Sequence, residues 1–303
     1  MLKKIVIALF VSFFQFNTLA NPVTEIKIAA GIVSGAYYPA ALQLCNFITK
    51  YSPITDCKAI ASSGSINNLN LLSTEKVDFA FVQSDVAQDA VDAVGIFSNQ
   101  KPFSELRTVM SFFPEYFSMI VRKESGIVKF SDMSDKRIGI NLRGSGARSS
   151  MLTLFKYFSF KKEPQIINVT DTQMPGKLCD NNVDAVVLFT GHPSGIASQI
   201  ASTCKISFVS IDFSKLDILV KENKVYESSV IPDNIYPGVA GATTFSTRAV
   251  FVTNADTDED KVQLFTKTIR ENFDEFRNLY PVFNSLNIED LFKTGILPSY
   301  ENR

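Results

Sequence analysis

Several features that commonly carry chemistry are scarce in this chain of 303 residues. It has a single histidine, His192, and a formal net charge of −1, from 30 Lys and Arg against 31 Asp and Glu. Such a balance excludes the basic surface by which proteins bind nucleic acid or anionic membranes. Small anionic ligands are not excluded, because they need only local charge. The hydrophobic fraction of 46 % is that of an ordinary globular protein, and the length predicts about two domains.

Cysteines are also few, and their spacing does not predict a metal site. No two of the four cysteines are close in sequence, and His192 completes no ligand pattern with them. We therefore expect neither a metal nor a cofactor. In an exported chain an even number of cysteines favours disulfides. Three pairings are open, of which the local one, Cys45–Cys57 with Cys179–Cys204, is the simplest.

Motifs of nucleotide-binding proteins and hydrolases are missing. No Lys follows the glycines of Gly144–Gly146 as a P-loop requires, and Gly31–Pro39 lacks the G-x-G-x-x-G spacing. The chain has no G-x-S-x-G elbow. Ser194 is close to His192 in sequence, but closeness in sequence does not make a catalytic pair. We expect no enzymatic activity, and an exported hydrolase that uses His192 is the less favoured alternative.

Apolar runs long enough to cross a membrane are absent after the first twenty residues. In the first twenty, Lys3 and Lys4 precede the apolar run Ile5–Phe16, and Thr18–Ala20 follows where a signal peptidase would cleave. We predict a signal peptide over residues 1–20 and a periplasmic mature protein. A membrane anchor is the alternative, but the run is shorter than the roughly 20 residues of a membrane span.

The rest of the chain alternates between strand and helix patterns. This alternation predicts an α/β fold with a largely parallel sheet covered by helices on both faces. Strands are expected at 25–30, 58–61, 78–82, 108–113, 117–122, 137–141, 165–169, 185–189 and 205–211, and helices at 38–50, 66–73, 85–94, 147–158 and 261–280. Ser65 is the expected cap of one helix, and Ser84 or Asp85 that of the next. Pro114 is expected to separate two strands.

Loops that follow predicted strands contain the candidate binding residues. In α/β sheets ligands bind beyond the carboxyl ends of the strands, near helix N-termini that attract anions. The candidates in these loops are Ser34, Tyr38, Ser65, Gln83, Ser84, Arg143, Ser145, Gly146 and Arg148. An Arg at such a place can hold a carboxylate through paired hydrogen bonds. Each loop can also be an ordinary turn or cap, and a lone exposed Arg is usually only solvated.

Two of these loops are built alike. The strand at 58–61 continues into Ser63–Ser65 and a helix, and the strand at 137–141 continues into Gly144–Gly146 and a helix. Asp and Gly commonly punctuate α/β units, so chance can also produce this repeat. The sharper interpretation is that the protein consists of two similar lobes.

Together the motifs resemble those of the TAXI family, the extracytoplasmic solute receptors of TRAP transporters. "GIVSGAYYP", "ASSGSINN", "FVQSDVA", "LRGSGAR", "GHPSG" and "YPG" follow one another in this order over nearly the whole mature chain, and "FVQSDVA" is the most specific. The resemblance implies a type II periplasmic-binding-protein fold of two α/β lobes joined by crossing hinge strands. Lobe 1 would be residues 21–112 plus 254–303, and lobe 2 residues 113–253. The crossing strands would lie at Phe113–Arg122 and Thr243–Thr253.

The resemblance also implies a function. A monomeric receptor would bind a small organic anion, glutamate- or dicarboxylate-like, between the lobes and deliver it to a TRAP-type permease. One wall would hold the candidates from Ser34 to Ser84, and the other wall those from Arg143 to Arg148 together with His192. Departures at Ala147 and Arg143, among others, remove hydroxyls and add a cation, so the ligand's identity does not carry over. A sensor kinase is the alternative partner, and a role in host interaction would not exclude transport.

Overall fold

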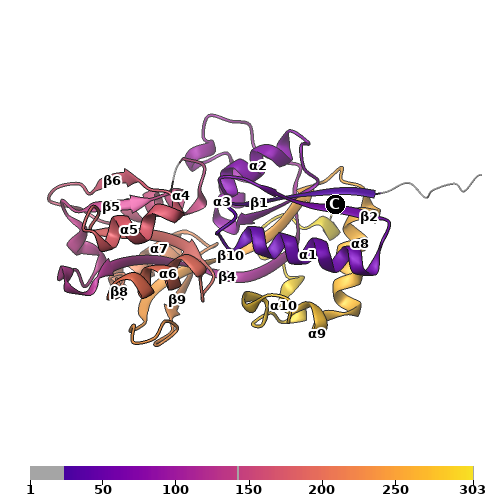
Figure 1. Ribbon diagram of the computed structural model, residues 1–303. Helices are drawn as coiled ribbons and strands as arrows, with labels where there is room; N and C mark the ends of the chain where they lie inside the picture. The colour runs from indigo at the N-terminus through magenta and orange to yellow at the C-terminus, as the bar shows by residue number, and fades with distance from the viewer. Residues whose placement is uncertain (1–23, 142, 303) are drawn as a thin grey trace, which may run out of the picture.

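The computed structural model describes residues 24–141 and 143–302, so the predicted signal peptide lies outside the described residues. One ten-stranded sheet runs through the molecule, and helices lie on both of its faces (Figure 1). The strands are β1 (Thr24–Gly31), β2 (Thr55–Ala61), β3 (Phe79–Gln83), β4 (Leu106–Arg122), β5 (Arg137–Ile140), β6 (Gln165–Asn168), β7 (Ala185–Thr190), β8 (Ile206–Phe208), β9 (Glu227–Ile231) and β10 (Ala242–Asn254). The helices are α1 (Tyr37–Tyr51), α2 (Ser65–Ser73), α3 (Ser84–Asp92), α4 (Gly146–Phe155), α5 (Met174–Cys179), α6 (Gly195–Thr203), α7 (Phe213–Glu222), α8 (Glu259–Glu271), α9 (Phe273–Phe276) and α10 (Ile288–Leu291).

The long strands β4 and β10 lie side by side at the centre of the sheet. The strand order is β2-β1-β3-β10-β4-β7-β5-β6, with β9 paired to β10 and β8 paired to β4. At one end β1 is parallel to β2 and β3, and at the other end β5 is parallel to β6 and β7. β4 and β10 are antiparallel to each other and to every strand beside them. The predicted α/β sheet is therefore confirmed, with an antiparallel centre.

The hydrophobic core is divided between the two ends of this sheet. Two apolar clusters, one on each face, join β1–β3 to α1–α3 and to the C-terminal helices; we call this part the first half. Two further clusters join β5–β8 to α4–α7 and form the second half. Along β4, Phe113 packs in the core of the first half and Phe117 packs in the core of the second. β4 and β10 thus supply apolar side chains to both halves.

Pro114 does not end a strand, so the prediction of two strands around it is wrong. β4 continues through it, and Pro114 pairs with Arg248 beside a register shift between Arg248 and Val250. A proline can sit inside a strand where the ladder is already irregular, because no regular hydrogen bond is lost there. The strand expected at 243–253 is confirmed as β10, which pairs with β4 along both halves.

The predicted caps of α2 and α3 are also wrong. α2 starts at Ser65, whose hydroxyl accepts a hydrogen bond from the backbone N–H of Gln83 at 3.0 Å. α3 starts at Ser84, whose hydroxyl bonds to the hydroxyl of Thr247 on β10. These side chains hold neighbouring elements together instead of satisfying the backbone of their own helix.

The helix predicted over 261–280 is interrupted. α8 ends at Glu271 and α9 starts at Phe273, because Asn272 takes a non-helical backbone conformation with φ −129°. The side-chain amide of Asn272 donates to the carbonyl oxygen of Thr268 at 3.0 Å and so satisfies one of the carbonyls at the end of α8. The break turns α9 back toward the first-half core, where Phe276 is fully buried.

Both local disulfides are present. Cys45 on α1 bonds to Cys57 on β2, and Cys179 at the end of α5 bonds to Cys204 after α6. The residues lie 12 and 25 positions apart in the chain. Each bond ties two neighbouring elements of one half, and neither joins the two halves.

We predict that replacing either cysteine pair by Ser lowers the free energy of unfolding by about 3 kcal/mol, because each bond restricts the unfolded chain. Urea denaturation of C45S/C57S and C179S/C204S against the oxidised protein measures this loss. Peptide mapping without reductant checks the pairing, and a crossed pair such as Cys45–Cys179 would contradict the fold.

Candidate functional site

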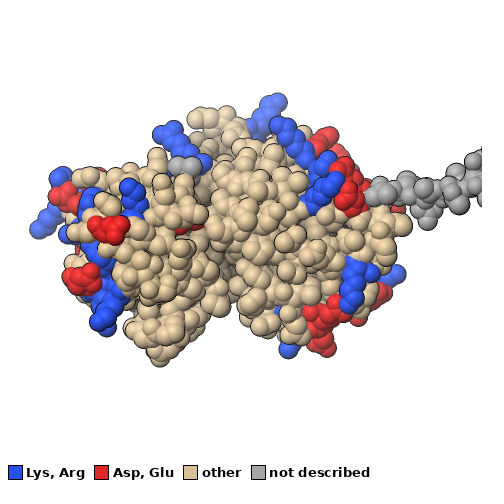
Figure 2. Space-filling view, in the orientation of Figure 1, with Lys and Arg blue, Asp and Glu red and all other residues tan. Residues whose placement is uncertain are grey.

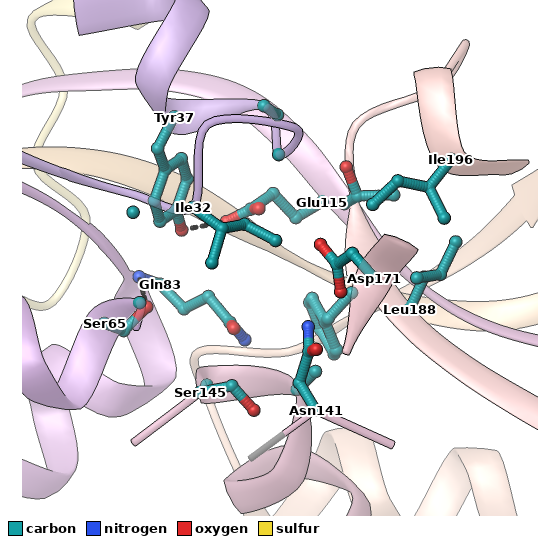
Figure 3. Close-up of a pocket in the computed structure, with 18 of the residues that line it drawn as sticks. Ile32, Tyr37, Ser65, Gln83, Glu115, Asn141, Ser145, Asp171, Leu188 and Ile196 are labelled. Atoms are coloured by element: carbon teal, nitrogen blue, oxygen red, sulfur yellow. Dashed lines mark hydrogen bonds between the residues drawn. The ribbon is translucent and has the colours of Figure 1, made fainter. Parts of the chain in front are cut away.

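A cavity lies where the two halves meet beside β4 (Figure 3). Its empty volume is about 660 Å³ when the open solvent at its mouth is counted, and about 90 Å³ of this is accessible to the centre of a water molecule. It is lined by Gly31, Ile32, Gly35, Ala36, Tyr37, Ser63, Gly64, Ser65, Gln83, Glu115, Asn141, Ser145, Gly146, Ala147, Asp171, Leu188, Phe189, Thr190, Ser194 and Ile196. Both halves therefore contribute walls.

The lining residues follow from the direction of the strands. Loops after β1, β2 and β3 supply the wall from the first half, and loops after β5, β6 and β7 supply the wall from the second. The carboxyl ends of parallel strands meet at one edge of a sheet, so these loops converge. Glu115 differs, because it projects from the crossing strand β4 itself.

Helix N-termini face the cavity from both walls. Ser65 starts α2, Gly146 starts α4, and Ser194 precedes α6. The hydroxyls of Ser145 and Ser194 each accept a bond from a backbone N–H in the first turn of their helices, at 3.4 and 3.5 Å. Other N–H groups of these turns and the partial positive charge of the helix ends attract an acidic group.

The two halves touch directly beside the cavity. The backbone N–H of Ile66 donates to the carbonyl oxygen of Gly144 at 3.2 Å. A Cβ added at Gly64 would lie 3.4 Å from Cα of Ser145. The two loops that look alike in the sequence therefore face each other across the cleft, and glycine allows their backbones to approach closely.

A buried polar network also joins the halves. Asp85 on α3 accepts hydrogen bonds from the hydroxyls of Ser150 on α4, at 2.5 Å, and of Tyr226 before β9, at 2.7 Å. The side-chain amide of Gln83 donates to Asp85 and to Ser150, both at 3.2 Å. Burial raises the pKa of Asp85, and the bonds from Ser150 and Tyr226 partly offset this.

Two acidic side chains line the cavity, and their protonation differs. Glu115 is 2 % exposed and accepts a hydrogen bond from the hydroxyl of Tyr37. Burial raises its pKa to about 8, so the group is mostly protonated at neutral pH. Asp171 is 6 % exposed, and burial raises its pKa to about 6, partly offset by hydrogen bonding to Asn141. At neutral pH Asp171 is therefore mostly charged.

The structure brings four of the ten predicted site residues to the cavity: Ser65, Gln83, Ser145 and Gly146. Gln83 and Ser145 come from opposite walls and border the same space (Figure 3). Ser34 is exposed on the loop after β1. Tyr38 packs against the first-half core, whereas its neighbour Tyr37 lines the cavity.

The other four predicted residues lie outside the lining. Ser84 is buried against β10, and its hydroxyl accepts a bond from the backbone N–H of Arg248 at 3.2 Å. Arg143 is exposed, and the guanidinium of Arg148 donates to the side chain of Asn168 at 2.8 Å. No Lys or Arg is part of the lining among the described residues. Figure 2 shows charged side chains on the outer parts of both halves and a mostly uncharged waist between them.

His192 has a structural environment. Its Nε2 lies 2.8 Å from the hydroxyl of Ser118, and its Nδ1 lies 2.6 Å from the hydroxyl of Tyr236. Burial lowers the pKa of His192 to about 4. Ser118 has no exposed surface, and neither residue lines the cavity, so this Ser–His pair is not placed to attack a substrate.

Sequence reasoning missed Tyr37, Glu115, Asn141 and Asp171. Asp171 follows the strand at Gln165–Asn168, so the rule that ligands bind at strand carboxyl ends could have found it. Glu115 stands between two apolar runs, where a lone charge is a signal of its own. Nothing in the sequence distinguished Tyr37 from Tyr38, because the choice depends on the rotation of α1.

Residues 24–141 and 143–302 contain neither a cluster of metal ligands nor a membrane-spanning helix. In that part of the chain no group of three or more His, Cys, Asp or Glu side chains is arranged to hold a metal ion. Within the same residues, no helix combines the length and the apolar character that a membrane crossing needs.

Two halves joined by crossing strands, with a cavity between them, define the fold of periplasmic binding proteins. The periplasmic aliphatic sulphonate binding protein SsuA from Escherichia coli is similar, with a TM-score of 0.51 and 13 % identity over 88 % of this chain and 81 % of that one. The ligand-binding component of an ABC-type import system from Staphylococcus aureus is also similar. Its TM-score is 0.53 and its identity 15 %, over 91 % of this chain and 85 % of that one. A third similar structure belongs to glutathione import via GshT and the cystine ABC importer TcyBC of Streptococcus mutans. Its TM-score is 0.59 and its identity 9 %, over 88 % of this chain and 99 % of that one.

The chain belongs to the NMT1-like family, whose sequence pattern matches residues 28–301. The match covers both halves and both crossing strands. At identities this low the solved structures show a shared fold, and the chemistry of the site has to be argued from the residues of this chain.

We predict that Glu115→Gln makes the protein more resistant to unfolding at high pH relative to wild type. The pKa of Glu115 rises from 4.5 in the unfolded chain to about 8 in the fold, so its contribution is complete below pH 4.5 and is lost as pH rises to 8. The full shift corresponds to at most about 5 kcal/mol. Urea denaturation of both proteins from pH 5 to pH 9 measures it. Glu105→Gln, at an exposed carboxyl group, controls for charge, and parallel curves for wild type and E115Q would contradict the prediction.

Proposed function

We propose that this protein is an extracytoplasmic receptor that binds a small solute between its two halves and delivers it to a membrane permease. One observation carries the proposal: a cavity whose walls come from both halves, at the carboxyl ends of their strands. A solute that touches both walls binds the closed arrangement better than the open one. This difference in affinity is what can drive closure.

The two halves, predicted as residues 21–112 plus 254–303 and 113–253, act as lobes in this proposal. Their hinge is the central part of β4 and β10, where the ladder is irregular and the core passes from one half to the other. The contacts between the halves beside the cavity make this the closed form. The membrane permease recognises that form.

An acidic group on the solute is supported by the helix N-termini of α2, α4 and α6, which point at the cavity from both walls. Arg143 and Arg148, which the sequence favoured for this task, are not part of the lining. We therefore assign the acidic group to backbone N–H groups and hydroxyls.

Two observations bear on the kind of permease, and they favour different ones. The motif order that resembles TAXI receptors favours a TRAP-type permease, whereas the structural neighbours named above include components of ABC importers. We propose the TRAP-type partner on the motifs. Uptake of the identified solute by cells expressing this chain with TRAP or with ABC permease subunits from the same genome decides between them. A solute that alters a sensor kinase without being taken up would point to the alternative partner.

Native mass spectrometry of the purified mature protein tests the receptor function. A bound small molecule, together with a smaller radius of gyration in the bound form by X-ray scattering, is the expected result. A protein that retains no solute and keeps its radius with every solute tried would contradict the proposal.

We predict that Gly146→Ala weakens closure. A Cβ there would overlap the side-chain amide of Gln83, which is buried and bonded across the cleft. Overpacking of this kind costs about 1–3 kcal/mol, so solute affinity should fall roughly 5- to 150-fold. X-ray scattering with solute should give a larger radius for G146A than for wild type. Gly195→Ala is the matched control, because nothing lies within 4 Å of its Cβ position, and an unchanged G146A would contradict the closed geometry.

A further inference from the structure

The Asp171 carboxyl group has a feature that the proposed function does not explain. Asp171 is only 6 % exposed, and its buried Oδ1 atom has no hydrogen-bond partner among the described residues. A buried carboxylate oxygen without a partner is costly, so native proteins rarely keep one without a reason. The group lines the cavity, and Figure 3 shows it directed between Glu115 and Asn141 toward the open space.

The described residues that line the cavity beside Asp171 carry no positive charge that could pair with its carboxylate. No Lys or Arg belongs to the cavity lining among the described residues, and the described histidine lies outside it. The other acidic group of the lining, Glu115, is mostly protonated at neutral pH and already bonded to Tyr37. The cavity therefore presents one anionic group to whatever enters it.

From this geometry we propose that the solute carries a protonated amine and that the Asp171 carboxylate binds it. The inference rests on the proposed receptor function and specifies its ligand class. Helix N-termini from both walls take the acidic group of the same solute, so the ligand is a zwitterion. An ammonium group supplies a positive charge and hydrogen-bond donors for this carboxylate. Dicarboxylates without an amine would place a negative group against Asp171 and bind weakly.

The test compares wild type with Asp171→Asn, which keeps the shape of the side chain and removes its charge. Both proteins are purified in parallel and denatured, and the released small molecules are treated with an amine-selective acylating reagent before mass spectrometry. Unloaded, refolded protein is then titrated calorimetrically with matched pairs that differ by one amine: L-glutamate and glutarate, L-aspartate and succinate, L-alanine and propionate. Asp212→Asn is the control, because Asp212 also has a buried oxygen without a partner among the described residues but lies outside the cavity.

The expected result is that wild type and D212N release an acylated solute and D171N does not. In titrations, the amine-bearing member of at least one pair, or the released solute itself, should bind D171N at least tenfold more weakly than wild type. The unloaded D171N should melt at a temperature equal to or above that of wild type, because it no longer buries an unpaired charge. This distinguishes a binding role from a structural one, in which the melting temperature would fall.

Two other outcomes would overturn the inference, and they are distinguishable. Release of an amine-free acid, or equal affinity of D171N and wild type for an amine-bearing solute, would refute the amine site and leave the receptor function standing. Absence of any released solute, together with no binding and no compaction for every probe and for the small-molecule fraction of a cell extract, would refute the receptor function and the amine site together.

Discussion

The pairing of β4 with β10 is the interaction on which the rest of the structure depends. Both strands supply apolar side chains to the first half and to the second, so neither core is complete without them. Their antiparallel ladder runs from Leu106 paired with Asn254 to Tyr116 paired with Ser246 and is irregular near Pro114. In the receptor that we propose, this irregular stretch is the hinge at which the walls of the cavity separate without breaking either core.

The contact between the halves is polar as well as close. Gln83, Asp85, Ser150 and Tyr226 satisfy one another in the closed arrangement, and water would hydrate them in an open one. Exchanging protein hydrogen bonds for water hydrogen bonds changes the free energy by little per bond. In the receptor that we propose, closed and open forms built in this way differ by a few kcal/mol, which a bound solute is able to reverse.

The cavity combines features that favour opposite charges. Helix N-termini attract an acid, whereas Asp171 attracts a cation, and Glu115 stays neutral at physiological pH because its burial costs more when it is charged. A solute that carries a negative and a positive group is attracted by the helix N-termini and by Asp171 at once. Figure 2 shows few charged side chains on the visible face of the waist, and no Lys or Arg belongs to the cavity lining among the described residues, so these few groups decide which charges the cavity attracts.

The sequence by itself determined the alternation of strands and helices and the loops that form the cavity, because periodicity and glycine-serine turns are local properties. It left three disulfide pairings open, of which the structure has the local one. Four residues that it singled out, Ser65, Gln83, Ser145 and Gly146, line the cavity. Tertiary structure alone decided that β4 runs through Pro114 and that Arg143 and Arg148 are not part of the cavity lining. It also decided that Asp171 lines the cavity while its buried Oδ1 atom has no hydrogen-bond partner among the described residues. These outcomes depend on how distant segments pack, and side-chain direction and burial are set by neighbours that lie far apart in the chain.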